Sequence, residues 1–228
     1  MRVKSVKKTP EQINIKNKKK LKINSKQQIF NITLTGILLG LAVAFSLIEI
    51  PIQFMGVILP LRIFDSLIIA FALPVIGLYY TLAIGIIEPW LHFLVDSDHP
   101  PVQIFFDDIA NILFIISFYV IYYYLFKLCN KGENLKVDVI KKVSAGLVII
   151  PLNAIIATLS FVLTLVVLYF SPNLARPDEY QESITNFIKY IAPVFFILIG
   201  IEVLRFIFIF SLFSLVEKKI GSTKRYYF

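Results

Sequence analysis

Long apolar runs, separated by short polar segments, dominate the pattern of this chain. A helix that crosses a bilayer needs about 20 mostly apolar residues, and six stretches approach that length. The predicted spans are roughly 30–50, 60–73, 75–95, 103–126, 142–170 and 188–216. The second span is short, and Pro74 and Gly77 predict a break between it and the third. The pattern therefore predicts an all-α membrane protein, built as a bundle of six transmembrane helices.

The composition agrees with a membrane protein and offers little for catalysis. Hydrophobic residues make up 57% of the 228 residues and charged residues 17%, against about 45–50% and 25% in soluble domains. Cys129 is the only cysteine, so an intramolecular disulfide is excluded. His92 and His99 are the only histidines, and a catalytic zinc site built from them would lack a ligand. With no P-loop, G-x-S-x-G or H-E-x-x-H motif, we expect no metal, no cofactor and no enzymatic activity.

The basic residues predict which side of the membrane each end faces. Residues 1–28 hold ten Lys or Arg and one acid, and the segments 127–142 and 218–225 bring the count to 19 of the 23 basic residues. The connections at 96–101 and 171–183 are mainly acidic. Because basic residues collect on the cytoplasmic side, we expect both termini to be cytoplasmic in a multi-pass protein of the cell membrane.

The chain divides into a membrane domain with two polar ends. We expect residues 1–28 to form a disordered, basic cytoplasmic tail, 29–218 the six-helix membrane domain, and 219–228 a short basic cytoplasmic end. Attraction of the tail to anionic lipid heads is an alternative to a role in orientation alone. No aromatic or folded framework accompanies the charge of the tail, so no nucleic-acid partner is expected.

An acid and a base lie in the middle of the last apolar run, APVFFILIGIEVLRFIFIFSLF. A charge at a helix centre costs about 2.5–3.5 kcal/mol on the insertion scale. Glu202 and Arg205 are three residues apart and therefore share one helix face. Because intramembrane charges usually mark substrate paths, we interpret the pair as part of a polar ligand site inside the bundle. A self-neutralising pair that only fixes helix packing is the alternative.

Other polar residues of the predicted spans are candidates for the same site. These further substrate-binding candidates are Asp65, Glu88, His92, Asp108, Asn111 and Asn153. An interfacial belt would explain Glu88 and His92 equally well, and a structural ion pair with Arg62 would explain Asp65. The spacing leaves open whether Asp107 or Asp108 faces the interior.

Small residues recur every four positions on the first predicted span. Gly36, Gly40 and Ala44 form a small-xxx-small face, on which another helix can approach closely. The pattern is common by chance, and packing within the bundle is the alternative to docking of a partner.

Three short motifs, in matching order, resemble one family of membrane proteins. They are IEIPIQFMGVILPLRIFDS, LPVIGLYYTLAIGIIEPWLHFL and GIEVLRF. They are similar to the first loop, the third helix and the last helix of the S components of energy-coupling factor (ECF) vitamin transporters. The riboflavin-binding members are the most similar, and the resemblance covers roughly residues 30–218.

The resemblance implies a fold and a mechanism that composition does not show. S components are six-helix bundles that bind a vitamin near the outer face, under a cap formed by the first loop. They dock by small residues of the first helix, here Gly36, Gly40 and Ala44, onto a transmembrane coupling subunit (the T component), which two cytoplasmic ATPases drive. By this resemblance, the chain is the substrate-binding subunit of an ABC-type importer for riboflavin or a related B-type vitamin.

The resemblance also assigns individual positions in the pocket. Asp65 matches the second acid of the family motif, and His92 matches its histidine. Glu202 stands in place of an Asn, and Arg205 and Glu88 each replace a Lys. An acid in the pocket favours a donor-rich or cationic ligand, although riboflavin stays allowed. A stand-alone secondary transporter of a small polar metabolite is the alternative, and the lack of a convincing internal repeat counts against it.

Overall fold

The computed structural model describes residues 25–54, 57–96, 100–128, 135–171 and 189–224. Its elements, in chain order, are α2 (Ser25–Ser46), β1 (Glu49–Phe54), β2 (Val57–Arg62), α3 (Phe64–Ile76), α4 (Leu78–Val95), α5 (Pro101–Phe118), the π-helix η1 (Tyr119–Leu125), α6 (Leu135–Phe170) and α8 (Ile191–Lys224). Five helices of this part of the chain, with α5 and η1 taken as one, are long and apolar enough to cross a membrane. The protein is therefore mostly helical and multi-pass.

The predicted break between the second and third spans is confirmed, and it lies at Gly77. This glycine has φ 86°, and its N–H bonds to the carbonyl of Leu73; the conformation is open to glycine because it has no Cβ. Pro74 stays inside α3, which has 13 residues. At 1.5 Å per residue α3 is about 20 Å long, against a hydrocarbon core of about 30 Å. Among the described residues, five of the six predicted spans are thus long and apolar enough to cross a membrane, and the second, already predicted to be short, is the shorter apolar helix α3.

The apolar segment before α3 is a β-hairpin, where the sequence suggested a loop and the start of a span. β1 and β2 pair antiparallel in a two-stranded sheet, and Glu49 lies opposite Arg62. Pro51 lies opposite Pro60, which is compatible because both strands are edge strands, where a missing N–H is tolerated. The prediction of an all-α chain is therefore wrong for this segment.

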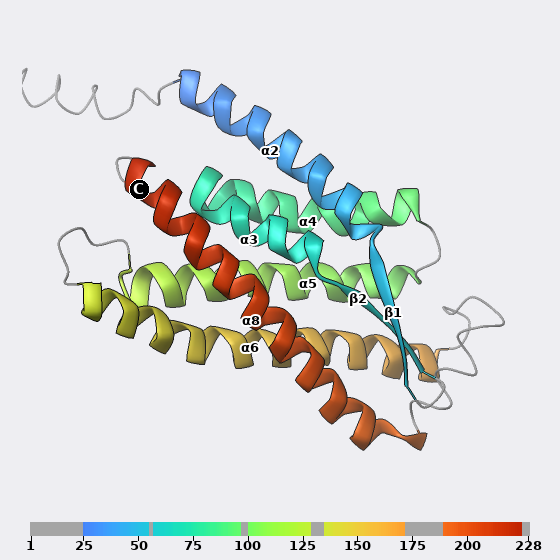
Figure 1. The fold of residues 1–228 in the computed structure, drawn as a ribbon. Helices are drawn as coiled ribbons and strands as arrows, with labels where there is room; N and C mark the ends of the chain where they lie inside the picture. The colour runs from blue at the N-terminus through green and yellow to red at the C-terminus, as the bar shows by residue number, and fades with distance from the viewer. Residues whose placement is uncertain (1–24, 55–56, 97–99, 129–134, 172–188, 225–228) are drawn as a thin grey trace, which may run out of the picture.

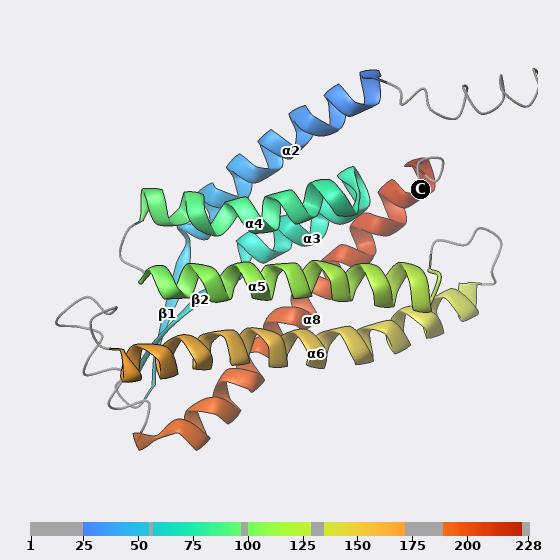
Figure 2. The same ribbon diagram turned by 180° about the vertical axis from the view of Figure 1, so that it is seen from behind.

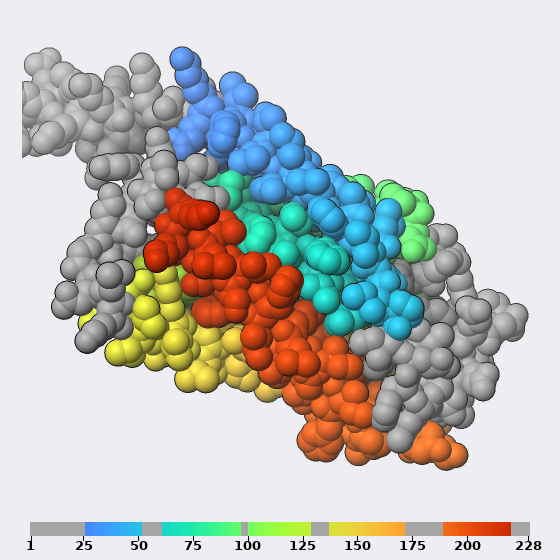
Figure 3. All heavy atoms as spheres, in the orientation of Figure 1, coloured from blue at the N-terminus to red at the C-terminus, as the bar shows by residue number. Residues whose placement is uncertain are grey.

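The helices form one bundle. α2 packs against α3 and α4, and α3 also packs against α8. Figure 1 shows α2, α3 and α8 in front of the other helices, and Figure 2 shows α4, α5 and α6 side by side from behind. In the space-filling view of Figure 3, α2, α3 and α8 lie next to one another and cover one face of the molecule.

Aromatic rings from α5, η1 and α8 form part of the core. The Phe213 ring meets Phe118 edge-on, with centroids 5.2 Å apart, and meets Tyr122 edge-on at 4.9 Å. On the outside of the bundle, large apolar side chains such as Leu147 and Phe196 stay exposed. Such a surface suits lipid tails, which are as apolar as these side chains.

The connections of the bundle are sorted between its two ends (Figure 1). The start of α2, the end of η1, the start of α6 and the end of α8 lie at one end, and the hairpin lies toward the other. The described basic residues at the first end include Lys26, Lys127, Lys142 and Lys218. This arrangement agrees with the predicted grouping of basic segments. The side of the membrane that this end faces, and hence a cytoplasmic location of both termini, stays a prediction.

The predicted domain limits fall partly outside the described residues. Of the expected tail 1–28, residues 25–28 already belong to α2. Of the expected C-terminal end 219–228, residues 219–224 continue α8. The boundaries of the membrane domain therefore stay predictions.

Candidate substrate-binding cavity

A polar cavity of about 110 Å³ lies inside the bundle. Its wall comes from β2 and from every described helix except α2 and η1. The charged residues of the wall are Arg62, Asp65, Glu88, Asp107, Glu202 and Arg205. The amides and hydroxyls of the wall are Ser66, Gln103, Asn111, Asn153, Ser160 and Thr164. Charges of both signs are thus gathered in the interior of an otherwise apolar bundle.

Glu202 and Arg205 meet on the cavity wall. Arg205 Nη1 lies 3.0 Å from Glu202 Oε2, as neighbours on α8. Arg205 Nη2 donates to Ser66 Oγ on α3, and Ser66 Oγ donates to Asp65 Oδ1 at 3.4 Å. These contacts join α8 to α3. The charges of Glu202 and Arg205 neutralise each other.

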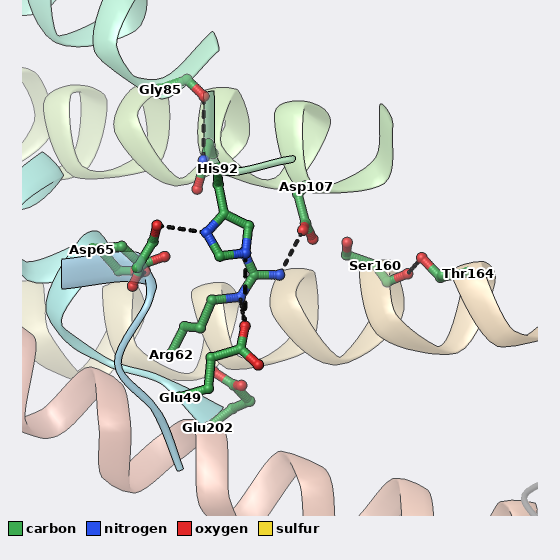
Figure 4. Close-up of polar contacts among 12 residues, drawn as sticks. Glu49, Arg62, Asp65, Gly85, His92, Asp107, Ser160, Thr164 and Glu202 are labelled. Carbon is green, nitrogen blue, oxygen red and sulfur yellow. Dashed lines mark hydrogen bonds and ion pairs between the residues drawn. The ribbon is translucent and has the colours of Figure 1, made fainter. Parts of the chain in front are cut away.

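Arg62, at the end of β2, is the second cation of the wall (Figure 4). Its Nη2 donates to Asp107 Oδ2 at 3.0 Å, and its Nε lies 3.3 Å from Glu49 Oε1. Burial alone would lower the pKa of Arg62, but the neighbouring carboxylates, Asp107 foremost, outweigh burial and raise it above its usual value. Arg62 is therefore a permanent cation that ties the hairpin to α5. It forms these ion pairs rather than the one with Asp65 that its spacing on the chain suggested.

Glu88 reaches the cavity from α4 and is not ion-paired there. Its side chain is 1% exposed, and its Oε1 atom has no hydrogen-bond partner in the described part of the chain. The ion pairs among the described residues of the wall engage Asp107 and Glu202, and neither Glu88 nor Asp65. Ser160 Oγ and Arg205 Nε are likewise buried without a partner among these residues. These buried polar atoms are therefore unsatisfied within the described part of the chain.

Pro89 shapes α4 beside Glu88. Because proline has no N–H, the carbonyl of Gly85, four residues earlier, loses its helical partner. Asn111 Nδ2 of α5 donates to this oxygen at 3.2 Å (Figure 4). Gly85 also permits the close approach of α5, because a Cβ there would lie 2.6 Å from Ile115 Cδ1. The proline and the glycine together set the spacing of α4 and α5 at the wall.

Asn153 of α6 is buried on the wall, in line with its predicted inward orientation. Its Oδ1 accepts a hydrogen bond of 2.9 Å from Ser117 Oγ of α5. Its Nδ2 donates to the carbonyl of Ile149 at 2.8 Å. The first of these bonds joins α5 to α6, and the second lies within α6, so both ends of the amide are engaged.

His92 lies outside the cavity wall, although the sequence placed it in the site. A hydrogen bond of 2.7 Å joins its Nδ1 to Ser46 Oγ, and its Nε2 lies 3.9 Å from Glu49 Oε1. This arrangement has the residue types of a Ser-His-acid triad. Ser46, however, is 0% exposed and is not part of the wall, so its hydroxyl is not presented to a ligand in the cavity.

Asp108 also lies outside the wall, and its neighbour Asp107 is part of it. Asp108 Oδ2 accepts a hydrogen bond of 2.7 Å from the indole of the half-exposed Trp90. The choice that the spacing left open is thus decided geometrically, with Asp107 toward the cavity.

The small-residue face of α2 makes no close contact inside the described bundle. A Cβ added at Gly36 or Gly40 would meet nothing within 4 Å, and Ala44 is exposed. α2 turns another face to the bundle, on which Ala42 and Ser46 are buried. The alternative that the small residues serve packing within the bundle is therefore not supported.

Several residues of the wall were not selected from the sequence. Ser160 and Thr164 follow Asn153 at i+7 and i+11, so a polar stripe along one face of α6 was the signal that could have found them. Gln103 carries no such signal. Within the described residues, no group of three or more His, Cys, Asp or Glu side chains is placed to hold a metal ion.

Comparison with known proteins gives two partial relatives. No protein-family model matches the chain. Uncharacterized proteins of Mycoplasma genitalium and Mycoplasma pneumoniae are 33% and 32% identical to it over 112 and 152 residues. The matches cover 46% and 60% of this chain, and only 29% and 39% of those relatives. The chain therefore spans well under half the length of the curated relatives it matches.

A solved structure gives the fold. The S component of a bacterial ECF transporter aligns with a TM-score of 0.53, over 86% of this chain and 97% of that one. The chain has the S-component fold. The sequence identity is 19%, so the likeness concerns the fold alone, and the riboflavin assignment and the roles of individual residues stay predictions.

Proposed function

We propose that this protein is the substrate-binding S component of an ECF-type importer and captures a water-soluble, vitamin-like molecule at the outer face. The observation that carries the proposal is the polar cavity in the bundle interior, where Glu202 and Arg205 lie 3.0 Å apart. Charges in the membrane interior are costly and usually mark substrate paths. The S-component fold supports the same function.

Riboflavin or a related B-type vitamin is the proposed ligand class. The predicted binding residues that line the cavity are Asp65, Glu88, Asn111, Asn153, Glu202 and Arg205. At about 110 Å³, the cavity is smaller than the roughly 300–1,000 Å³ of usual ligand pockets. A ligand as large as riboflavin therefore requires the wall to move apart on binding, and a smaller vitamin requires less movement.

The proposed partners are a T component and two cytoplasmic ATPases, which would supply the ATP hydrolysis that this chain lacks motifs for. The exposed face of Gly36, Gly40 and Ala44 is the proposed docking surface for the T component. Small residues let the backbones of two membrane helices approach closely. α2 lines no part of the cavity, so docking there leaves the ligand undisturbed.

Uptake of radiolabelled riboflavin and other B-type vitamins into proteoliposomes tests the function. With a T component and two ATPases present, we expect uptake of one vitamin that depends on ATP. The double variant Gly36→Leu, Gly40→Leu is expected to abolish uptake and to retain ligand binding, because the side chains block docking. Gly200→Leu is the matched control, since Gly200 is an exposed glycine of α8 with nothing within 4 Å of an added Cβ.

Other outcomes would contradict the proposal. Uptake without ATP and without partner subunits would identify a stand-alone secondary transporter. Failure of every vitamin to bind would remove the function as stated. Unchanged ligand affinity in the double variant Glu202→Ala, Arg205→Ala would remove these two residues from the site.

A further inference from the structure

The charges on the cavity wall do not balance. The wall carries four carboxylates and two guanidinium groups. Each guanidinium group is already paired with a carboxylate of the wall, Arg62 with Asp107 and Arg205 with Glu202. Arg62 is shared with a further carboxylate, that of Glu49. Two carboxylates of the wall, Asp65 and Glu88, are left outside these ion pairs.

Both of these carboxylates are buried. Glu88 is 1% exposed and Asp65 is 6% exposed. The two groups are near enough to interact electrostatically, and like charges at close range add to the cost of burial. A buried charge is retained in proteins when it is paired or hydrogen-bonded, yet Glu88 Oε1 has no partner among the described residues. Arg62 is close enough to both carboxylates to interact with them, but it is already ion-paired with Asp107 and Glu49, so negative groups outnumber positive ones on this wall.

Aromatic side chains of the wall suit a carbon skeleton. Phe114, Phe161 and Phe206 line the cavity from α5, α6 and α8. Aromatic rings bury large apolar surfaces, and their faces attract cations. The unpartnered Arg205 Nε and Ser160 Oγ offer donors to an acceptor atom elsewhere on the ligand. These features fit an organic molecule better than a bare metal ion.

We infer that the molecule bound in the cavity is a small organic cation, with its positive nitrogen between Asp65 and Glu88 and its carbon skeleton against the phenylalanine rings. This inference rests on the proposed function and names its substrate class. An uncharged vitamin would leave the excess of carboxylates on the wall uncompensated, and an anionic one would add to that excess.

A charge series on one ring tests the inference. Pyridoxamine, pyridoxine and 4-pyridoxate share a pyridine ring and carry an ammonium, a hydroxyl and a carboxylate group at the same position. Thiamine and riboflavin, one cationic and one uncharged, extend the series to larger molecules. Isothermal titration of each compound into the full-length protein in detergent, near neutral pH, gives the affinities. We expect a cationic member to bind most tightly.

Two variants locate the counter-ions. Glu88→Gln keeps the shape of the side chain and removes its charge, as Asp65→Asn does for the other carboxylate. Each is expected to weaken binding of the cation by roughly 30-fold or more, the lower range for loss of one partner of a buried charge pair, and to weaken binding of pyridoxine by a smaller factor. Glu217→Gln is the matched control, because Glu217 is also buried (3% exposed) but accepts a hydrogen bond from Tyr122 at 3.1 Å, away from the cavity wall.

The possible results test the cation inference and the S-component function separately. Tightest binding of pyridoxine, riboflavin or 4-pyridoxate would overturn the inference and leave the S-component function standing. The inference would also be overturned if the cation bound with unchanged affinity to both Glu88→Gln and Asp65→Asn. If none of these compounds binds, the inference fails, and the proposed function fails with it only if the other B-type vitamins do not bind either. Circular dichroism and thermal unfolding of each variant separate loss of charge from loss of fold, and if one variant does not fold, the other decides.

Discussion

The strength of the Glu202–Arg205 ion pair tests whether the pair lies in a low-dielectric interior of the bundle. The nearest nitrogen and oxygen lie 3.0 Å apart, and the two side chains are 11% and 12% exposed. Two unit charges about 4 Å apart interact by roughly 4 kcal/mol at the effective dielectric constant of about 20 that suits proteins. Removing one partner of a buried pair typically costs about 3–5 kcal/mol, because the other charge is left uncompensated. We therefore expect Arg205→Met alone to destabilise the protein by about 3–5 kcal/mol.

A double-mutant cycle measures the coupling. Glu202→Gln, Arg205→Met and the double variant are unfolded reversibly in mixed micelles and followed by circular dichroism. The double variant should be more stable than the sum of the single effects predicts, by on the order of 3 kcal/mol. Asp138 and Lys142, an ion pair of 3.2 Å at i, i+4 on α6, serve as the control, with an expected coupling of about 0.3–0.5 kcal/mol. An equally small coupling for the α8 pair would refute its placement in a low-dielectric interior.

Two further predictions concern packing and the outer rim of the site. Gly146→Ala places a Cβ 2.8 Å from the Phe210 ring and should destabilise the protein by about 1–3 kcal/mol in thermal unfolding. Gly200→Ala, which meets nothing within 4 Å, should not destabilise it, and equal losses for both would show that α6 and α8 do not pack as described. Asp108→Ala removes the 2.7 Å acceptor of the Trp90 indole and should shift the fluorescence of this only tryptophan. It should leave ligand affinity unchanged, and a loss of affinity would return Asp108 to the site.

Residues that interrupt the apolar pattern were the most informative part of the sequence. The cost of a charge in the membrane interior predicted that Glu202 and Arg205 face inward, and the structure places both on the cavity wall. Pro74 and Gly77 predicted a break between the second and third spans, and the structure places it at Gly77. Binding of a ligand by these wall residues stays a prediction.

Contacts between residues far apart in the chain could not be predicted from the sequence. Arg62 pairs with Asp107, 45 residues away, rather than with Asp65, three residues away. This choice depends on how α5 packs beside the hairpin, and a spacing rule does not contain that information. The hairpin itself was missed because a short apolar run has no period that separates a strand from a loop or a helix. The partner of the Gly85 carbonyl, which Pro89 frees, was equally hidden, since Asn111 reaches Gly85 only after α4 and α5 have packed.

Arg62 belongs to the hairpin and to the cavity wall at once. Any movement of the hairpin away from α5 would withdraw a positive charge from the cavity and leave Asp107 without its guanidinium partner. The open cavity would then be more negative than the closed one, and low-dielectric walls focus such a field toward the entrance. The association rate of a cation would then be raised by electrostatic attraction and would fall with ionic strength. A bound cation would be attracted less strongly once Arg62 was again part of the wall. The hairpin would thereby set the speed of capture separately from the strength of retention.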